Sequence, residues 1–556
     1  MAALEENGAR CVVRALLAAG VEVCFANPGT TEMVLVDAFD QVPGMRAVLC
    51  MHETVCAGAA DGYARMALRP ACTLLHLGVG LANAAANLHN AKRASSKIVN
   101  LVGDMATWHV DTDPLLASDI VGLAQWCSAH TRQCGAEPAA LAGDVAGALV
   151  AIRDYRAGAS RIATLILPHD AQRGACAYKA PDELLKLLKD EPQRGTLFEA
   201  SIQVHNAHFG GEDAIPRHMR TVAEALKRGK AAILVGGAGS VDAAALAACV
   251  KLGRATGCSL LVENAFARVE RGIGSPAFAR LPYFPADAKK FLSKFETVVL
   301  CGSREPVAMF GYDDGISKLV EQQTLLEIDA MDVPGALQYL AGLVDECGLA
   351  DECGLADECK DVSNAPPAAR AAKAPAGKLT AFKVCQVLCA AQPEGAIIVD
   401  ESLTTGGAYW DLSAGCAAFS HLTLTGGAIG VGPPLSVGAA VACPGRRVID
   451  FQADGSGLYS TPALWTQASE RLDVTTLICA NRAYQILKVE QQKQKLTTAG
   501  VFAKKLTALS EPFVDWVALA KGYGVDAVSV DTAEDLHAAL RGSFERKGPF
   551  LIEARF

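Results

Sequence analysis

The sequence predicts an α/β fold made of three domains, each built on a parallel sheet. Short apolar runs, typical of buried strands, alternate with longer segments in which apolar residues recur at helical spacing. This alternation is typical of βαβ units, in which helices cover a parallel sheet. The chain has 556 residues, a length from which about three to four domains are expected.

The composition narrows the class of protein. Hydrophobic residues make up 51% of the chain and charged residues 20%, which is typical of a globular protein with large cores. The net charge of -9 predicts no nucleic-acid partner, and no apolar run has membrane-spanning length, so no membrane partner is expected. The amino terminus lacks the pattern of a signal peptide. The 19 scattered cysteines indicate reduced thiols inside the cell, in the cytoplasm by default, with organelle targeting left open.

The first domain is predicted over residues 1–175. The segment Asn27–Glu32 predicts a turn followed by a helix start, and Gly78-Val-Gly80 is interpreted as a glycine turn after a strand. Strands are expected at 21–25, 46–51, 71–77 and 97–102, and helices at 5–19, 54–66 and 81–94.

The second domain is predicted over residues 216–344 and is followed by a repeat-containing linker at 345–377. Strands are expected at 231–237, 259–262, 297–302 and 325–329. The glycines at 236, 237 and 239 follow a strand but miss the G-x-G-x-x-G spacing of a dinucleotide turn. In the linker, Asp-Glu-Cys-Gly-Leu-Ala recurs nearly three times. Its cysteines could bind a metal, but slippage of a short repeat explains them more simply: Cys347, Cys353 and Cys359.

The third domain is predicted over residues 378–556. A glycine-rich segment at 425–434 precedes a helix that ends at Ala442. Strands are expected at 396–399, 447–451, 474–479, 527–530 and 549–554, and helices at 381–391, 462–470, 513–523 and 533–544.

Two polar side chains follow neighbouring strands of this third domain. Asp454 follows one apolar run, and Asn481 follows the next run 27 positions later. With a helix between the strands, both side chains are expected at the carboxyl edge of the sheet, where open α/β sheets bind ligands. Oxygen ligands of this kind suit a hard divalent cation that also carries a diphosphate.

Further polar residues lie at predicted strand ends and helix starts. Hydroxyls and free N–H groups there can hold phosphate, at Ser402, Thr404, Thr405, Gly455 and Ser456. Glu53 begins a helix, where the dipole favours a carboxylate in any protein. His76 ends a strand before the glycine turn. Taken alone, Glu53 and His76 are more readily explained as structural residues.

The combined pattern resembles the thiamine-diphosphate-dependent decarboxylase and carboligase superfamily. Ala453-Asp-Gly-Ser456 with Asn481 is similar to the diphosphate motif of that family, and His52–Arg65 is similar to its pyrimidine-domain glutamate motif. The resemblance covers nearly the whole chain, in the order pyrimidine-binding, central and diphosphate-binding domain. Segments including Leu75-His76 and Asp400–Ser402 look most like benzoylformate decarboxylases and acetolactate synthase large-subunit-like proteins.

The resemblance implies a role in cofactor binding for each matched residue. It implies that Asp454, the Asn481 side chain and the Ala483 carbonyl bind Mg²⁺ on thiamine diphosphate. It also implies that phosphate oxygens are held by Thr404, Thr405, Gly455 and Ser456. Ile429 would support the cofactor in its bent form, and the Gly427 carbonyl would accept a hydrogen bond from the cofactor's amino group. Glu53 would exchange a proton with ring nitrogen N1′.

The implied reaction is decarboxylation of a small 2-keto acid, with or without carboligation as in acetolactate synthase. Thr30 is matched to a contact with the substrate carboxylate, His76 to a proton relay, and His109 is a further candidate for the pocket. Residues 306–314 contain no histidine where benzoylformate decarboxylase has its second one, so the choice of reaction stays open. FAD binding stays undecided, and a non-catalytic or regulatory member of the fold is the alternative.

The resemblance also implies an assembly. In this superfamily the pyrimidine domain of one subunit faces the diphosphate domain of another. We therefore expect a homodimer or homotetramer with active sites at subunit interfaces.

Overall fold

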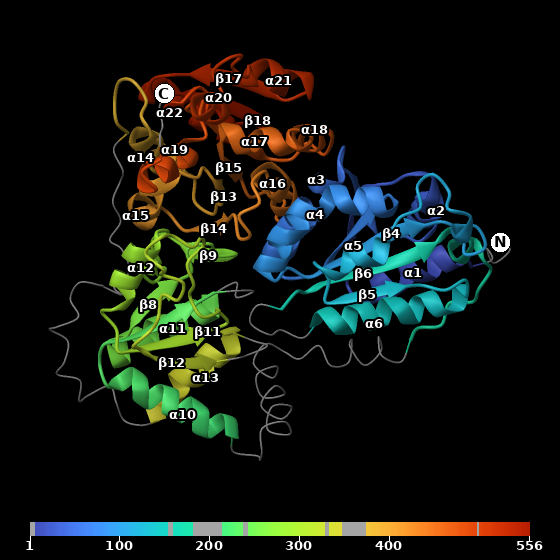
Figure 1. Cartoon of the computed structure of the whole chain (residues 1–556), viewed down its shortest axis with the longest axis horizontal. Helices are drawn as coiled ribbons and strands as arrows, with labels where there is room; N and C mark the ends of the chain where they lie inside the picture. The colour runs from blue at the N-terminus through green and yellow to red at the C-terminus, as the bar shows by residue number, and fades with distance from the viewer. Residues whose placement is uncertain are drawn as a thin grey trace.

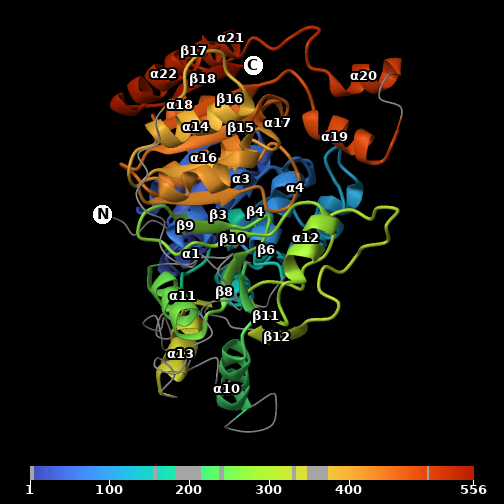
Figure 2. The same ribbon diagram turned by 90° about the vertical axis from the view of Figure 1, so that its left-hand side faces the viewer.

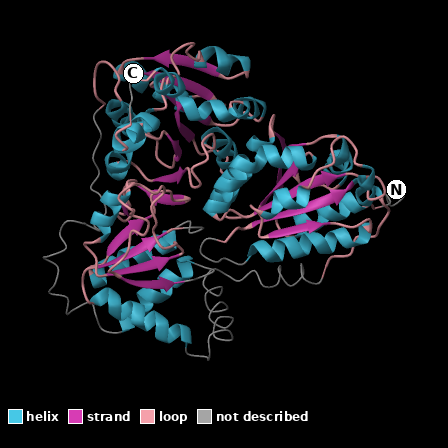
Figure 3. Ribbon diagram, in the orientation of Figure 1, coloured by secondary structure: helices cyan, strands magenta, loops and turns pink. Residues whose placement is uncertain are grey.

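The computed structural model describes residues 6–153, 159–181, 214–236, 243–328, 333–346, 374–496 and 500–556. These residues form three sheets with helices packed around them, one in each third of the chain (Figure 1). Strands lie inside and helices outside in all three regions (Figure 3). All strand pairs are parallel except one in the third sheet. The predicted α/β fold class is therefore confirmed.

The first sheet has six strands in the order β2-β1-β3-β4-β6-β5. Its strands are β1 (Val23–Asn27), β2 (Arg46–Leu49), β3 (Ala71–Leu75), β4 (Ile98–Asp104), β5 (His130–Gln133) and β6 (Ile162–Pro168). The helices around it are α1 (Gly8–Ala18), α2 (Met33–Gln41), α3 (Glu53–Ala67), α4 (Leu77–Ala94), α5 (Ile120–Gln125), α6 (Leu141–Arg153) and α7 (His169–Arg173), with short 3₁₀ turns η1 (Thr30–Glu32), η2 (Val110–Thr112) and η3 (Pro138–Ala140).

The predicted glycine turn at 78–80 is wrong, because these residues form the first turn of α4. The glycines are needed for space. A Cβ atom on Gly80 would lie 2.8 Å from Glu53 Oε1, and one on Gly78 would overlap Ser118 Oγ. Close approach between helix and neighbour, rather than a reversal of the chain, therefore explains both glycines.

The second sheet has five parallel strands in the order β10-β8-β7-β11-β12. They are β7 (Ala231–Val235), β8 (Ser259–Val262), β10 (Ala279–Arg280), β11 (Thr297–Cys301) and β12 (Thr324–Ile328), with helices α10 (Ala214–Lys227), α11 (Ala243–Thr256), α12 (Pro285–Leu292) and α13 (Val333–Glu346). The predicted repeat and its cysteines, together with Gly237 and Gly239, lie outside the described residues.

The third sheet has seven strands in the order β17-β18-β16-β15-β13-β14-β9. The strands are β9 (Arg268–Arg271), β13 (Ile397–Glu401), β14 (Phe419–Thr423), β15 (Val448–Ala453), β16 (Val474–Ala480), β17 (Asp526–Val530) and β18 (Phe550–Arg555). Its helices are α14 (Ala381–Ala391), α15 (Tyr409–Leu412), α16 (Gly432–Ala442), α17 (Asp454–Gly457), α18 (Pro462–Ser469), α19 (Gln485–Lys493), α20 (Val501–Thr507), α21 (Trp516–Gly522) and α22 (Ala533–Glu545), with 3₁₀ turns η4 (Thr405–Ala408), η5 (Ser413–Gly415) and η6 (Leu458–Ser460).

Two strands of this sheet were not predicted. β14 lies within the third region, and β9 comes from the middle of the chain and pairs antiparallel with β14. The chain between β8 and β10 thus reaches over to extend the third sheet, and it ties the second and third regions together.

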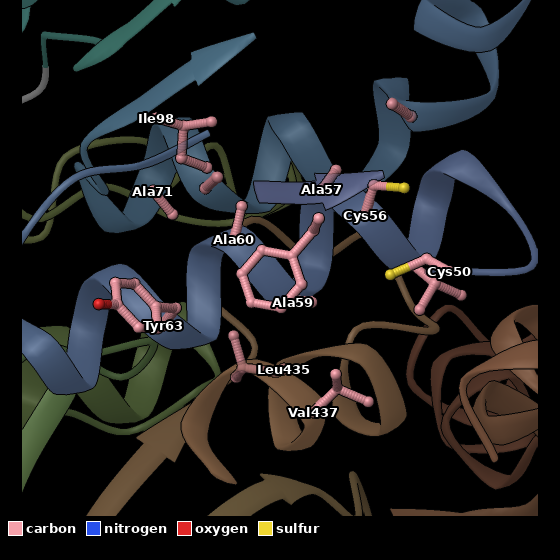
Figure 4. Close-up of a cluster of buried hydrophobic side chains, with 14 of the residues drawn as sticks. Cys50, Cys56, Ala57, Ala59, Ala60, Tyr63, Ala71, Ile98, Leu435 and Val437 are labelled. Carbon is pink, nitrogen blue, oxygen red and sulfur yellow. The ribbon is translucent and has the colours of Figure 1, made fainter. Parts of the chain in front are cut away.

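The first and third regions pack directly on each other through α3 and α16 (Figure 2). Side chains of both helices share one buried cluster, in which Ala59 and Tyr63 of α3 face Leu435 of α16 (Figure 4). Cβ atoms on Gly62 or Gly438 would overlap the backbone of the opposite helix. The glycines therefore allow the two helices to approach closely. Within the described ranges, no helix combines the length and the apolar character that crossing a membrane requires.

Candidate functional site

Asp454 and Asn481 lie at the carboxyl ends of adjacent parallel strands. Asp454 directly follows β15, and Asn481 directly follows β16. The two strands pair with Ala453 opposite Cys479, so the two strand ends are level. This arrangement is the one that the spacing of the apolar runs predicts.

Backbone donors hold both side chains. Asp454 is only 5% exposed, and its carboxylate accepts hydrogen bonds from the N–H groups of Gly455 (2.9 Å) and Arg482 (2.6 Å). Asn481 Oδ1 accepts from Ala483 N–H at 2.9 Å. Burial raises the pKa of Asp454, and the two N–H donors oppose that rise. The Asp454 carboxylate and the Asn481 amide oxygen are the kind of oxygen ligands that suit a hard divalent cation.

Three of the hydroxyl residues proposed to hold phosphate are fixed in the same edge of the sheet. Ser402 Oγ donates to Asp400 Oδ1 at 2.6 Å, and Thr405 N–H donates to the Ser402 carbonyl at 3.1 Å. Ser456 Oγ accepts from Gln452 Nε2 at 2.5 Å. Thr404 is exposed between them. A Cβ atom on Gly455 would lie 2.6 Å from the ring of Tyr484, so Gly455 lets that ring cover the turn.

The glycine-rich segment 425–434 is held between the first and third regions. Asn90 of α4 donates to the Ala428 carbonyl at 2.7 Å, and a ring nitrogen of His89 lies 3.1 Å from the Gly426 carbonyl. Gly427 has a φ of 76° and is exposed, and Ile429 is half-buried. Among the described residues no group donates to the Gly427 carbonyl, which leaves it free to accept from a ligand.

Glu53 is the first residue of α3 and is 7% exposed. Its Oε2 accepts from Asn83 Nδ2 at 3.0 Å, and Gly80 gives the carboxylate room. Both neighbours belong to α4. No sequence pattern singles out Asn83, because an asparagine in a helix has many explanations.

Thr30 and His76 come together at a second strand end of the first region. The His76 ring packs on Gly29, directly before Thr30, and its Nδ1 lies 2.9 Å from Glu32 Oε2. Glu32 is fully buried and also accepts from Gly29 N–H at 2.8 Å. The capping-box pattern in the sequence predicts the bond from Gly29 N–H to Glu32, but it does not predict the contact between His76 and Glu32.

His109 lies apart from this pair in the contacts of the described chain. Its Nδ1 is 3.2 Å from Thr112 Oγ1, and its ring lies beside Trp108. Neither contact joins it to His76 or Glu53.

Backbone strain marks three of the strand ends. Leu77, Leu403 and Arg482 adopt left-handed φ angles of 52°, 52° and 57°. They directly follow His76, Ser402 and Asn481, respectively. Non-glycine residues hold such angles only where the surroundings enforce them, and such strain clusters at functional sites.

Comparison with known proteins places two parts of the chain in known domain families. Residues 6–124 match the family model of the thiamine pyrophosphate enzyme N-terminal TPP-binding domain, and residues 414–554 match that of the C-terminal TPP-binding domain. A Mycobacterium tuberculosis protein provisionally named acetolactate synthase large subunit IlvX is 42% identical over 552 residues, or 98% of each chain. Benzoylformate decarboxylase of Pseudomonas aeruginosa is 28% identical over 550 residues, or 96% of each chain.

The fold is also found among solved structures. Thiamine diphosphate-dependent 4-hydroxybenzoylformate decarboxylase of Rhodococcus jostii RHA1 superposes with a TM-score of 0.78 over 99% of each chain, at 22% identity. The two matched domain models contain Glu53 and Asp454, respectively. The high identity to a full-length relative and the two matched domains show that the chain belongs to the thiamine pyrophosphate enzyme family.

Proposed function

We propose that this chain is a thiamine-diphosphate- and Mg²⁺-dependent enzyme that acts on a 2-keto acid and breaks or forms a C–C bond next to the carbonyl. The observation that carries the proposal is the pair Asp454 and Asn481 at level, adjacent strand ends, in a family member that also has a buried Glu53 at a helix start.

In this proposal the third region holds the charged end of the cofactor. Asp454, Asn481 and the Ala483 carbonyl would hold Mg²⁺, which would neutralise charge on the diphosphate. Hydroxyl and N–H groups of Thr404, Thr405, Gly455 and Ser456 hold the phosphate oxygens. The bonds from Gly455 and Arg482 N–H already orient the Asp454 carboxylate, so little reorganisation is needed when the cation binds.

Thiamine diphosphate, when bound, supplies an electron sink for the carbon next to the keto group. Glu53 exchanges a proton with N1′ of its aminopyrimidine ring, and Asn83 keeps the carboxylate oriented. Ile429 supports the bent form of the cofactor, and the Gly427 carbonyl accepts a hydrogen bond from the amino group. The exposed Gly427 and half-buried Ile429 support these roles.

The substrate is proposed to lie against Thr30 and His76. Glu32 accepts from Nδ1–H of His76, so Nε2 is left to take up or deliver a proton. Thr30 contacts the substrate carboxylate. Residues 306–314 offer Phe310, which is 54% exposed, and no histidine. The names of the relatives cover both a decarboxylase and an acetolactate synthase, and both reactions remain candidates for this chain.

The proposal includes the domain limits 1–175, 216–344 and 378–556, with a linker at 345–377, and a homodimer or homotetramer. In the described chain the contacts of Glu53 are with α4 of its own region, and none joins it to Asp454. A site completed by the third region of a second copy is consistent with those contacts.

A screen of 2-keto acids for CO₂ release, with and without thiamine diphosphate and Mg²⁺, tests the function. Release that requires both additions supports the proposal. Acetolactate from pyruvate without free aldehyde would identify a carboligase, and aldehyde alone would identify a simple decarboxylase. Cofactor binding without turnover of any substrate would favour the non-catalytic alternative.

A further inference from the structure

A buried polar cluster lies beneath the start of α16 and is not used by the proposed chemistry. Its members are Glu401 at the end of β13 and Asp450 and Gln452 on one face of β15. Glu401 pairs directly opposite Gln452 in the sheet. All three are at most 1% exposed. Buried carboxyl groups are costly unless they are bonded, so such a cluster needs an explanation.

Glu401 binds the backbone on both sides of Val431. Its Oε1 accepts from Gly430 N–H at 2.6 Å, and its Oε2 accepts from Gly432 N–H at 2.7 Å. Gly430 directly follows Ile429, and Gly432 is the first residue of α16. Both oxygens of one rigid group thus fix the end of the segment that contains Gly427 and Ile429.

Gln452 connects the same place to the diphosphate turn. Its Nε2 donates to Ser456 Oγ at 2.5 Å. Its Oε1 lies beside Gly432, because a Cβ atom there would overlap it and would be 2.8 Å from Asp450 Oδ1 and 3.0 Å from Glu401 Oε2. Three side chains therefore converge on the space beside Gly432 that a Cβ atom would occupy.

Several oxygens of the cluster lack a hydrogen-bond donor within the described ranges. Gln452 Oε1 and both oxygens of Asp450 have no hydrogen-bond partner among the described residues. Burial and the neighbouring Glu401 raise the pKa of Asp450 well above its usual value. The Thr476 hydroxyl, directly opposite Asp450 in the sheet, opposes that rise and is a donor beside the cluster.

We propose that Glu401 is a positioning residue that, through Gln452, links the 425–434 segment to Ser456 and so sets both ends of the third region's cofactor site. This inference rests on the proposed function, because it needs a ligand that spans the two ends. Glu401 itself touches neither the cofactor nor the substrate in this assignment.

Two calorimetric titrations of the full-length, cofactor-free protein test the link. One uses thiamine diphosphate with Mg²⁺, and the other uses inorganic pyrophosphate with Mg²⁺, which lacks the rings that Gly427 and Ile429 are proposed to hold. For Glu401→Gln we expect the Kd of thiamine diphosphate to rise about tenfold or more, since a charged acceptor of two N–H groups is lost. The Kd of pyrophosphate should stay within about twofold. Gln452→Leu, which removes the bond to Ser456, should weaken binding of both ligands.

Asp450→Asn is the matched control. It makes the same acid-to-amide change in the same cluster, but Asp450 forms no hydrogen bond with the 425–434 segment, whereas Glu401 accepts two, so both Kd values should match the unmodified chain. If Glu401→Gln behaves like this control in both titrations, the proposal is overturned. If Glu401→Gln does not fold, Glu401→Asp replaces it in both titrations. Its carboxylate is one methylene too short to reach both N–H groups, and the same selective loss is expected.

Two further measurements distinguish failure of the proposed role of Glu401 from failure of the proposed diphosphate site. Hydrogen exchange of the peptide covering 425–434 should be faster in Glu401→Gln than in Asp450→Asn without any ligand, and equal exchange contradicts the role of Glu401. Asp454→Asn should weaken both ligands. If that variant binds both normally, the diphosphate site itself is wrong, whatever Glu401 does.

Discussion

The first and third regions hold their buried carboxylates in different ways. In the first region, Glu53 and Glu32 contact side chains, namely the Asn83 amide and the His76 ring, and among the described contacts only Glu32 also accepts from a backbone N–H group, that of Gly29. In the third region, Asp454 and Glu401 each accept from two backbone N–H groups. A backbone N–H cannot titrate or rotate away, whereas an imidazole can gain or lose a proton.

The difference suggests a division of work within the proposed function. Fixed backbone donors suit a region that holds a cation and a diphosphate in one geometry. Contacts to a histidine and an amide suit a region that moves protons. Burial raises the pKa of Glu401 to about 7, and its N–H donors limit that rise. The following changes test whether the third region binds the cofactor while the first region transfers protons. They run from the largest expected effect to the smallest.

Removing the titratable group of Glu53 should have the largest effect. In Glu53→Gln the amide oxygen can still accept from Asn83, so folding is preserved but proton exchange is lost. We expect kcat to fall by about 1000-fold with little change in the Kd of thiamine diphosphate. Steady-state rates and calorimetry measure the two quantities. Glu22→Gln, at an exposed position of the same region, is the control. A normal kcat in Glu53→Gln would refute the assigned role.

Removing the charge of Asp454 should instead act on binding. Asp454→Asn loses the one charged ligand of the proposed cation site, so the Kd of thiamine diphosphate with Mg²⁺ should rise by about 100-fold. Titration over a range of Mg²⁺ concentrations measures it. Asp411→Asn, on α15 and exposed, should bind normally. If Asp454→Asn binds thiamine diphosphate with an unchanged Kd, the third region is not part of the cofactor site.

A milder change tests the pair in the first region. In Glu32→Gln the amide oxygen can still accept from His76 Nδ1, but the negative charge beside the ring is gone. We expect kcat to fall by about tenfold and its pH profile to shift. If Glu32 acts through His76, Glu32→Gln should cost nothing further in a chain that already carries His76→Gln. Additive losses would mean that Glu32 acts independently of His76.

The sequence predicts strand ends better than it predicts what surrounds them. Asp454 and Asn481 could be placed because each ends an apolar run, and parallel pairing makes such ends level. The prediction of a turn at Gly78 and Gly80 is wrong because a glycine that leaves room for a neighbouring side chain looks the same in sequence as one that makes a turn. The role of Glu401 is equally hidden, since its partners are backbone N–H groups that any residue has.

The two missed strands have a related cause. β9 contains three charged residues in four, and β14 carries Ser420 and His421 in its buried core. Each is accommodated by distant partners: Ser420 donates to Glu270 at 2.8 Å, and His421 lies 3.3 Å from Asp400. Partners from different parts of the chain make these polar strands stable, and no local pattern reveals them.

The smallest expected effect concerns stability and the buried His421 of the third region. Burial lowers the pKa of His421 to about 4, and Arg271 and Arg280 add to this, while the bond to Asp400 opposes it. Because the folded pKa lies below the unfolded value of about 6.5, the neutral ring contributes stability above pH 6.5 that is lost as pH falls toward 4.

His421→Gln removes this titration while keeping a donor for Asp400. Between pH 6.5 and pH 4.5, the Tm of the unmodified chain should therefore fall more steeply than that of the variant, and the two curves should converge toward acid pH. Thermal melts at closely spaced pH values measure the difference. Parallel curves would show that His421 does not titrate on unfolding.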